Sequence, residues 1–127
     1  MGDDKMEAER KSMAIISSSD KVEEAYKTFI MAATGAAMDI DVTIFFTMSG
    51  LNLVKKGGAD KIEMPNAPKL KELLEQAKES GVQLNPCSLS MEAMGVKPED
   101  LIDGLSKPIG AATAIDLALK ADLTLSF

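Results

Sequence analysis

The sequence predicts an α/β fold in three layers, α/β/α, with a mainly parallel sheet of about five strands. Short apolar runs of strand length alternate along the chain with segments in which apolar residues recur at helical spacing. A parallel connection between strands needs a crossover of about a dozen residues, usually a helix, so this alternation favours a parallel sheet. The chain has 127 residues, of which 46% are hydrophobic and 27% charged. That length and composition suit one globular domain with a sizeable core.

The domain is expected to occupy residues 12–127. Residues 1–11 mix acidic and basic side chains with few apolar ones. We therefore expect them to form a disordered N-terminal tail.

The first strand is expected at residues 13–16, an apolar run that ends at three turn-forming serines. Asp20 and Glu23 form a capping-box-like pair, which predicts the start of a helix. Apolar residues then recur at helical spacing as far as about Met38. This is the helix that the pattern indicates most strongly.

A second strand is expected at residues 42–46, because this apolar, β-rich run is short enough to be a strand buried on both faces. A short helix is expected over residues 51–56. It would end at Gly57 and Gly58, which lack the surrounding glycine or Walker pattern of a phosphate-binding loop.

A further amphipathic helix is expected to begin near Pro68 and to be closed by Gly81, the residue type preferred after a helix C-terminus. Residues 82–84 then predict a third strand, which leads to Cys87. A helix starting just after Cys87 would favour the thiolate over the thiol, because the unpaired N–H groups of its first turn carry partial positive charge.

The last third of the chain predicts a short helix at residues 98–100, where proline suits the first turn. A helix is expected over residues 109–121 and a closing strand over residues 123–127. A weak fifth strand is expected near Leu105.

Ligands in such folds bind beyond the carboxyl ends of the strands. The predicted strands bring three segments to that edge: residues 17–19, 47–50 and 86–90. Hydroxyl groups, a glycine and the only thiol of the chain would therefore share one crevice.

Cys87 is the only cysteine, and the chain has no histidine. These two facts exclude the Cys-His dyad, the Ser-His-Asp triad, histidine-based zinc sites and every Cys-x-x-Cys arrangement. No metal site is predicted. Any thiol chemistry must be activated by backbone and hydroxyl dipoles.

The net charge of −6 argues against nucleic acid and against anionic membrane surfaces as partners. No apolar run approaches the roughly 18 residues of a membrane span, so no membrane insertion is expected. A lone cysteine forms no internal disulfide, and no secretory signal is visible, so a cytoplasmic location is expected. No cofactor-specific pattern appears, and we expect no cofactor.

Several stretches of the chain resemble the DsrE/DsrF-like family. They are Phe45-Phe46-Thr47, Gly50-Leu51-Asn52, the segment 87–95 with the pattern Cys-x-x-Ser-Met-x-x-Met-Gly, and the ending 121–127. The resemblance runs from about Met13 to the C-terminus. It implies the fold described above and a sulfur carrier or sulfurtransferase that holds sulfane sulfur as a persulfide on Cys87. It also implies sulfur donor and acceptor proteins as partners and a homo-oligomer, a trimer or hexamer.

The expected site has Cys87 as its catalytic residue. We expect the groups that bind or stabilise the sulfur, and the residues that form the pocket wall, to come from the same sheet edge. The binding residues are Ser88, Leu89, Ser90, Ser17, Ser18, Thr47, Ser49 and Gly50, and the wall residues are Met91 and Met94.

Plainer interpretations stand beside these. Cys87 could be a packed hydrophobe in a non-catalytic oligomeric or ligand-binding subunit, or a redox thiol that needs an external resolving thiol. Ser88 and Ser90 would cap a helix in any case, since a cap and an anion cradle use the same N–H groups. Met91 and Met94 are spaced as core residues are.

Overall fold

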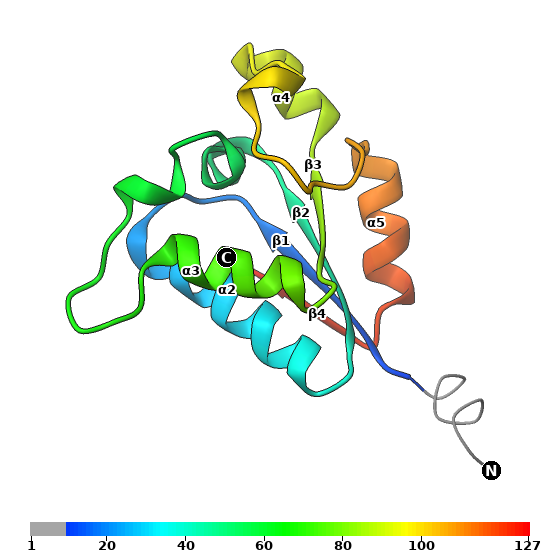
Figure 1. Cartoon of the computed structure of the whole chain (residues 1–127). Helices are drawn as coiled ribbons and strands as arrows, with labels where there is room; N and C mark the ends of the chain where they lie inside the picture. Colours follow the sequence, from blue (N-terminus) through cyan, green and yellow to red (C-terminus); the bar gives the residue numbers. More distant parts are fainter. Residues whose placement is uncertain (1–9) are drawn as a thin grey trace.

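The computed structural model describes residues 10–127 and contains one four-stranded sheet. Its strands are β1 (Ser12–Ser17), β2 (Asp41–Phe46), β3 (Gln83–Pro86) and β4 (Leu123–Ser126). They lie in the order β3-β2-β1-β4, and every neighbouring pair is parallel. The predicted α/β class is confirmed (Figure 1).

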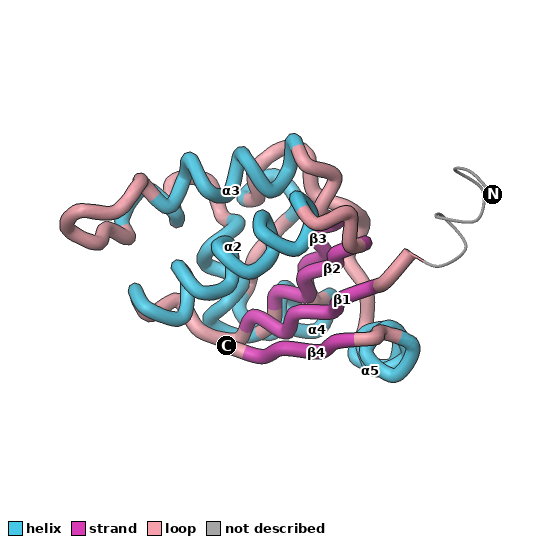
Figure 2. The backbone as a smooth tube through the Cα atoms, turned by 90° about the horizontal axis from the view of Figure 1, so that it is seen from below, coloured by secondary structure: helices cyan, strands magenta, loops and turns pink. Residues whose placement is uncertain are grey.

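Helices cover both faces of the sheet. The helices α2 (Val22–Ala37) and α3 (Leu70–Glu79) lie side by side on one face, and α5 (Ala111–Lys120) lies on the other (Figure 2). The short helix α4 (Ser88–Met94) follows β3 at the carboxyl edge of the sheet, at the top of Figure 1. The first two crossovers therefore use one face and the last uses the opposite face. This gives the three layers that the sequence predicts.

Three 3-10 helices complete the described part of the chain. They are η1 (Met48–Val54), η2 (Ala59–Lys61) and η3 (Pro98–Asp100). Among the described residues, no helix combines the length and the apolar character that crossing a membrane requires.

Alternating side chains of the strands divide the core into two clusters. Ile15, Ile44 and Phe46 belong to the larger cluster, which packs against α2 and α3. The rings of Phe29 and Phe46 lie 6.1 Å apart there, between α2 and β2. The alternate residue Phe45 belongs to a smaller cluster with residues on the α5 side of the sheet. That smaller cluster contains Cys87.

The weak fifth strand predicted near Leu105 is not present. The chain beyond Leu105 nevertheless runs beside β3, because Ser106 N–H donates to Leu84 O at 2.8 Å and Ile109 N–H donates to Pro86 O at 3.0 Å. Pro108 lies between them and has no N–H to donate, which interrupts the ladder. The segment therefore covers the edge of β3 without forming a regular strand.

Two other local predictions need correction. The short helix expected over residues 51–56 is the 3-10 helix η1, which begins earlier and ends at Val54. The capping box of Asp20 and Glu23 does not form, since Lys21 is the N-cap of α2 and makes no side-chain cap bond. Asp20 instead accepts a hydrogen bond of 3.0 Å from Asn52 Nδ2, so its carboxylate joins the loop before α2 to η1.

The expected disordered tail lies mostly outside the described residues. Of that range only Arg10 and Lys11 are described. Arg10 Nε lies 2.9 Å from Asp41 Oδ1, and Lys11 O accepts a hydrogen bond of 2.9 Å from Asp41 N–H. Both contacts join the start of β1 to the start of β2.

Candidate functional site

Cys87 occupies the junction between β3 and α4. Its N–H donates to Phe46 O at 2.8 Å, which continues the pairing of β3 with β2 by one residue. It is also the N-cap residue of α4, and its Sγ accepts a hydrogen bond from Ser90 N–H at 3.4 Å. Serine, threonine, asparagine or aspartate usually fills this position. The thiol sulfur therefore takes the place of a capping oxygen at the start of the helix that the sequence predicts.

Ser90 links this helix to the end of β2. Its side chain is buried, and Ser90 Oγ accepts a hydrogen bond of 2.9 Å from Met48 N–H. Ser90 Oγ also lies 3.1 Å from Thr47 Oγ1 and 3.7 Å from Met48 Sδ. The hydroxyl groups of Ser90 and Thr47 therefore belong to one network beside the thiol, with Ser90 coming from α4 and Thr47 from the end of β2.

The pKa of the Cys87 thiol results from two opposing effects. Burial raises it, because a thiolate is poorly solvated inside the protein. Hydrogen bonds from the side chain and N–H of Ser90, from the Thr47 side chain and from the Leu89 N–H lower it. The hydrogen bonds prevail, and the pKa lies below its ordinary value. The site thus favours the thiolate without an imidazole, as a chain that lacks histidine requires.

The same thiol is well enclosed. Cys87 is 4% exposed and packs in the smaller core cluster with Phe45, Ile109 and Ala114. Ile109 N–H donates to Pro86 O, and Ser88 N–H donates to Ile109 O at 2.9 Å, so the segment before α5 is hydrogen-bonded on both sides of Cys87. One side of the sulfur therefore meets polar donors and the other meets apolar side chains. It is more sheltered than the crevice that the sequence predicts.

Ser17 and Gly50 meet at the carboxyl ends of β1 and β2. A Cβ built on Gly50 would lie only 2.0 Å from Ser17 O, so no larger residue fits there without a backbone shift. Ser17 O accepts a hydrogen bond from Thr47 N–H at 2.9 Å, whereas the buried Ser17 Oγ has no partner among the described residues. These two residues position Thr47, and neither contributes a hydrogen bond to the sulfur.

Three of the serines expected to bind the sulfur do not contact it, and Leu89 contacts it only through its backbone. Ser88 Oγ donates to Ile109 O at 3.2 Å, and Ser18 Oγ donates to Phe127 O at 3.2 Å. Ser49 is exposed. Leu89 contributes only its backbone N–H to the thiol, and its side chain is 66% exposed.

The two methionines expected in the pocket wall differ in their environment. Met91 is buried in the larger core cluster, and Met94 is exposed. Met91 therefore has the plainer role that its helical spacing indicates, which is packing in the core. Neither belongs to the cluster around Cys87.

Two residues near the thiol, Ile109 and Ala114, were not expected there, and the contacts of Met48 were not expected although segment 47–50 was placed at this edge. Met48 adopts φ +48°, a left-handed conformation that is uncommon outside glycine, and contacts Ser90 through both its N–H and its sulfur. Ile109 and Ala114 cover the sulfur from the α5 side. Hydrophobic periodicity could have found Ala114, but no sequence signal marks Ile109 as a neighbour of Cys87.

No group of three or more histidine, cysteine or acidic side chains that could hold a metal ion occurs in residues 10–127. The chemistry that these residues can support is that of a thiolate with hydroxyl and backbone N–H donors.

Comparison with known proteins gives the following similarities. A family model described as "DsrE/DsrF-like family" matches residues 11–127. The uncharacterized protein MJ0760 of Methanocaldococcus jannaschii is 35% identical over 101 residues, which cover 80% of this chain and 36% of that protein. The chain thus spans about a third of this longer relative. The sulfur carrier protein DsrE2 of Allochromatium vinosum is 26% identical, covering 92% of this chain and 98% of that one.

Two solved structures have a similar fold. The YchN protein from E. coli superposes with a TM-score of 0.74 at 16% identity, covering 93% of this chain and 99% of that chain. The protein of unknown function MTH1491 from Methanobacterium thermoautotrophicum superposes with a TM-score of 0.71 at 12% identity, covering 91% and 98%. At these identities the likeness concerns the fold alone.

Proposed function

The chain belongs to the DsrE/DsrF-like family, and we propose that it is a sulfur carrier in which Cys87 holds sulfane sulfur as a persulfide and passes it to a partner protein. The observation that carries the proposal is the position of the Cys87 thiol, which caps α4 by accepting a hydrogen bond from Ser90 N–H beside the hydroxyl groups of Ser90 and Thr47. The direction in which these groups shift its pKa, downward, agrees with that role. The likeness to a relative named as a sulfur carrier supports the same role.

Loading requires the thiolate form of Cys87. The thiolate attacks the outer sulfur of a donor persulfide, R–S–SH, so that a new S–S bond forms on Cys87 and the donor's S–S bond breaks. The donor leaves as R–S⁻, and the proton stays on the transferred sulfur. No electron is gained or lost overall, so no general base or cofactor is needed once the thiol is ionised.

Unloading reverses these roles. A thiolate of the acceptor attacks the outer sulfur of the Cys87 persulfide, the S–S bond breaks, and Cys87 leaves as a thiolate. A thiol of low pKa leaves faster in such exchanges. The hydrogen bonds from Ser90 and Thr47 therefore favour both the attack during loading and the departure during unloading.

Access to the sulfur requires movement on the α5 side. Cys87 is 4% exposed, and its apolar cover consists of Ile109, Ala114 and Phe45. Phe45 is part of β2, whereas Ile109 precedes α5 in a segment without regular secondary structure. We propose that this segment and the first turn of α5 move aside when a partner binds.

Exposed apolar side chains lie on α4 and beside it. Met48, Leu89 and Met94 are exposed, and Met48 touches Ser90 directly. Exposed apolar groups of this kind favour protein contacts. We propose that the sulfur donor and acceptor proteins dock over these three residues, in the cytoplasm or another reducing compartment that keeps the thiol free.

A second apolar surface belongs to α5. Ile115 and Leu119, four residues apart on this helix, are 60% and 80% exposed, and Ala114 is the only residue of the helix that is buried. We propose that this helix face packs against other copies of the chain in a homo-oligomer, a trimer or hexamer.

The burial of Cys87 favours one alternative. In a non-catalytic subunit the cysteine would only fill space between β3 and α5, and it would not react while the protein is folded. A persulfide-transfer experiment separates the two functions. The protein is loaded with polysulfide, freed of excess reagent and mixed with an acceptor protein that carries one exposed thiol.

The sulfur-carrier proposal predicts that sulfane sulfur moves to the acceptor thiol, and that Cys87→Ser neither loads nor transfers. Transfer that is equally fast from the Cys87→Ser variant would contradict it, and so would a wild-type protein that remains folded and unloaded.

A further inference from the structure

A hollow lined by lysines lies where η1 leads into η2. It has a volume of about 260 Å³, below the roughly 300–1,000 Å³ of pockets that hold drug-sized ligands. It therefore suits a small ligand. The residues that line it include Asp20, Asn52, Lys55, Lys56, Gly58 and Lys61.

The turn that presents these lysines is tightly defined. Gly58 N–H donates to Lys55 O at 2.9 Å, and Gly57 adopts φ +77°, which favours glycine. A Cβ built on Gly58 would lie 1.9 Å from Asn52 O, so the turn packs directly on η1. Lys56 N–H donates to Asp100 O at 2.9 Å and fixes the turn from the other side. Two glycines are thus required for different reasons in a turn that holds lysines beside a cavity.

The charge in this hollow is unbalanced. Three lysines line it against one carboxylate, that of Asp20, and Asp20 already accepts a hydrogen bond from Asn52. Among the described residues, Lys55, Lys56 and Lys61 form no ion pair within 4.0 Å. The chain as a whole carries −6. A local excess of positive charge in a concave site attracts anions and strengthens their binding.

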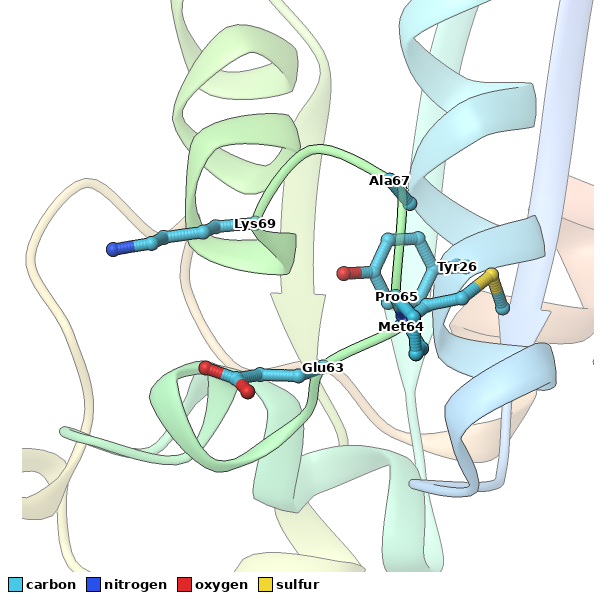
Figure 3. A pocket seen from close by; sticks show the side chains of 6 residues that line it. All are labelled: Tyr26, Glu63, Met64, Pro65, Ala67 and Lys69. Carbon is cyan, nitrogen blue, oxygen red and sulfur yellow. The ribbon is translucent and has the colours of Figure 1, made fainter.

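Two neighbouring hollows show no such excess. One, of about 330 Å³, is lined by Lys69 and Lys71 against Asp60 and Glu63. The other, of about 380 Å³, has Lys69 and Glu63 extending to the same side of the Tyr26 ring (Figure 3). Their charges balance in pairs, so these hollows carry no preference for an anion.

We propose that the hollow at Lys55, Lys56 and Lys61 binds a small tetrahedral oxyanion, either a phosphoryl group or a sulfur oxyanion. Lysine ammonium groups bind such anions through charge-assisted hydrogen bonds. The hollow shares none of the residues that contact Cys87, and the proposal stands whether or not Cys87 carries sulfur.

Isothermal titration at constant ionic strength tests this, with inorganic phosphate, pyrophosphate, sulfate and thiosulfate as separate probes. The Cys87→Ser protein is used throughout, so that no heat comes from reaction of thiosulfate with the thiol. Saturable binding of one or more probes at one site is the expected result. Binding of phosphate and pyrophosphate alone identifies a phosphoryl ligand, and binding of sulfate or thiosulfate alone identifies a sulfur oxyanion.

The variant Lys55→Gln/Lys61→Gln is expected to bind at least about tenfold more weakly, because it removes two charge-assisted hydrogen bonds to the anion. The matched control Lys11→Gln/Lys107→Gln loses the same charge at two residues that do not line the hollow, and it is expected to stay within about twofold of the parent, since salt screens exposed charges that do not contact the anion. The proposal is overturned if no probe binds saturably, or if both double variants weaken binding equally.

Discussion

Hydrogen bonds lower the pKa of the Cys87 thiol, and only some of their donors could be predicted from the sequence. A helix follows the cysteine, as predicted. Ser90 and Thr47 lie with Cys87 at the carboxyl edge of the sheet, also as predicted. Which hydroxyl reaches the sulfur could not be predicted, because that depends on loop dihedral angles such as the φ of +48° at Met48. The apparently equivalent Ser49 is exposed for the same reason.

Replacement of Ser90 tests the source of the lowered pKa. Ser90→Ala removes the side-chain hydrogen bond to the thiol and is expected to raise the pKa of Cys87, because that hydrogen bond lowers it. The pH dependence of iodoacetamide alkylation measures it. Ser49→Ala, which alters an exposed serine one residue beyond Met48, is the control and should leave the profile in place. An unchanged profile in Ser90→Ala would show that the hydroxyl does not act on the sulfur.

The lowered pKa also predicts how stability depends on pH. The folded protein binds the thiol proton more weakly than the unfolded chain does. In the unfolded chain the thiol titrates at about pH 8.5. The thiolate contribution is therefore fully present above the unfolded pKa and is lost as pH falls through the lower folded pKa. Urea unfolding of the wild type and of Cys87→Ala should give a free-energy difference that grows in favour of the wild type as pH rises through this window. A difference that shrinks with rising pH would indicate a buried, inert thiol.

At the scale of secondary-structure elements, the strands and helices that position Cys87 could be predicted from the sequence, whereas the segment that covers its sulfur could not. The strands and the helices α2, α3 and α5 follow the predicted segments closely because their apolar periodicity is clear. The extended segment from Leu105 to Ile109 was harder to assign, since Pro108 removes one bond of the ladder and leaves a covering segment in place of a strand. That segment encloses the thiol, which explains why its burial was underestimated.

The mobility of this cover can be tested by trimming it. Ile109→Ala should raise the alkylation rate of the folded protein several-fold without raising the pKa of Cys87, because it removes no hydrogen bond to the sulfur and reduces the burial that raises this pKa. Leu101→Ala deletes a similarly buried side chain in the larger cluster and controls for general destabilisation. Equal acceleration in both variants would mean that the thiol reacts only through global unfolding.

The contact between the end of β1 and η1 leaves no room for a side chain at Gly50. Gly50→Ala would place Cβ against the backbone of Ser17, which cannot move cheaply, and should lower the free energy of unfolding by about 1–3 kcal/mol or more. Gly110→Ala is the control, because its Cβ would meet only Ser88 Oγ at 3.9 Å at an ordinary φ of −90°. Thermal and urea unfolding of both variants measure the effect, and equal stability of the two would contradict the close contact.

At the scale of the whole molecule, the parallel sheet and the layering were predictable, whereas the strand order was not. Alternating strands and helices imply parallel crossovers, but no local pattern states that β4 lies beside β1 and β3 lies at the opposite edge. The alanines of α2 could in principle pack within the chain or between subunits. Ala32 and Ala33 are already buried in the single chain, which leaves α5 as the more exposed apolar helix.

The proposed oligomer depends on that helix. The wild type should have the mass of a trimer or hexamer by light scattering, and Ile115→Glu/Leu119→Glu should reduce it to smaller species because charges would be buried at the interface. Ile30→Glu places a charge on the exposed side of α2 and should not change the assembly. A wild type that is monomeric at all concentrations would refute the proposed assembly.

Intact-mass spectrometry of the native protein after exposure to polysulfide tests the central proposal most directly. We predict that the wild type gains the mass of one sulfur atom on Cys87, reversibly on reduction, and that Cys87→Ser gains none. A folded wild type whose mass does not change under these conditions, but whose cysteine becomes modified once urea unfolds it, would contradict the assignment of Cys87 as a sulfur carrier.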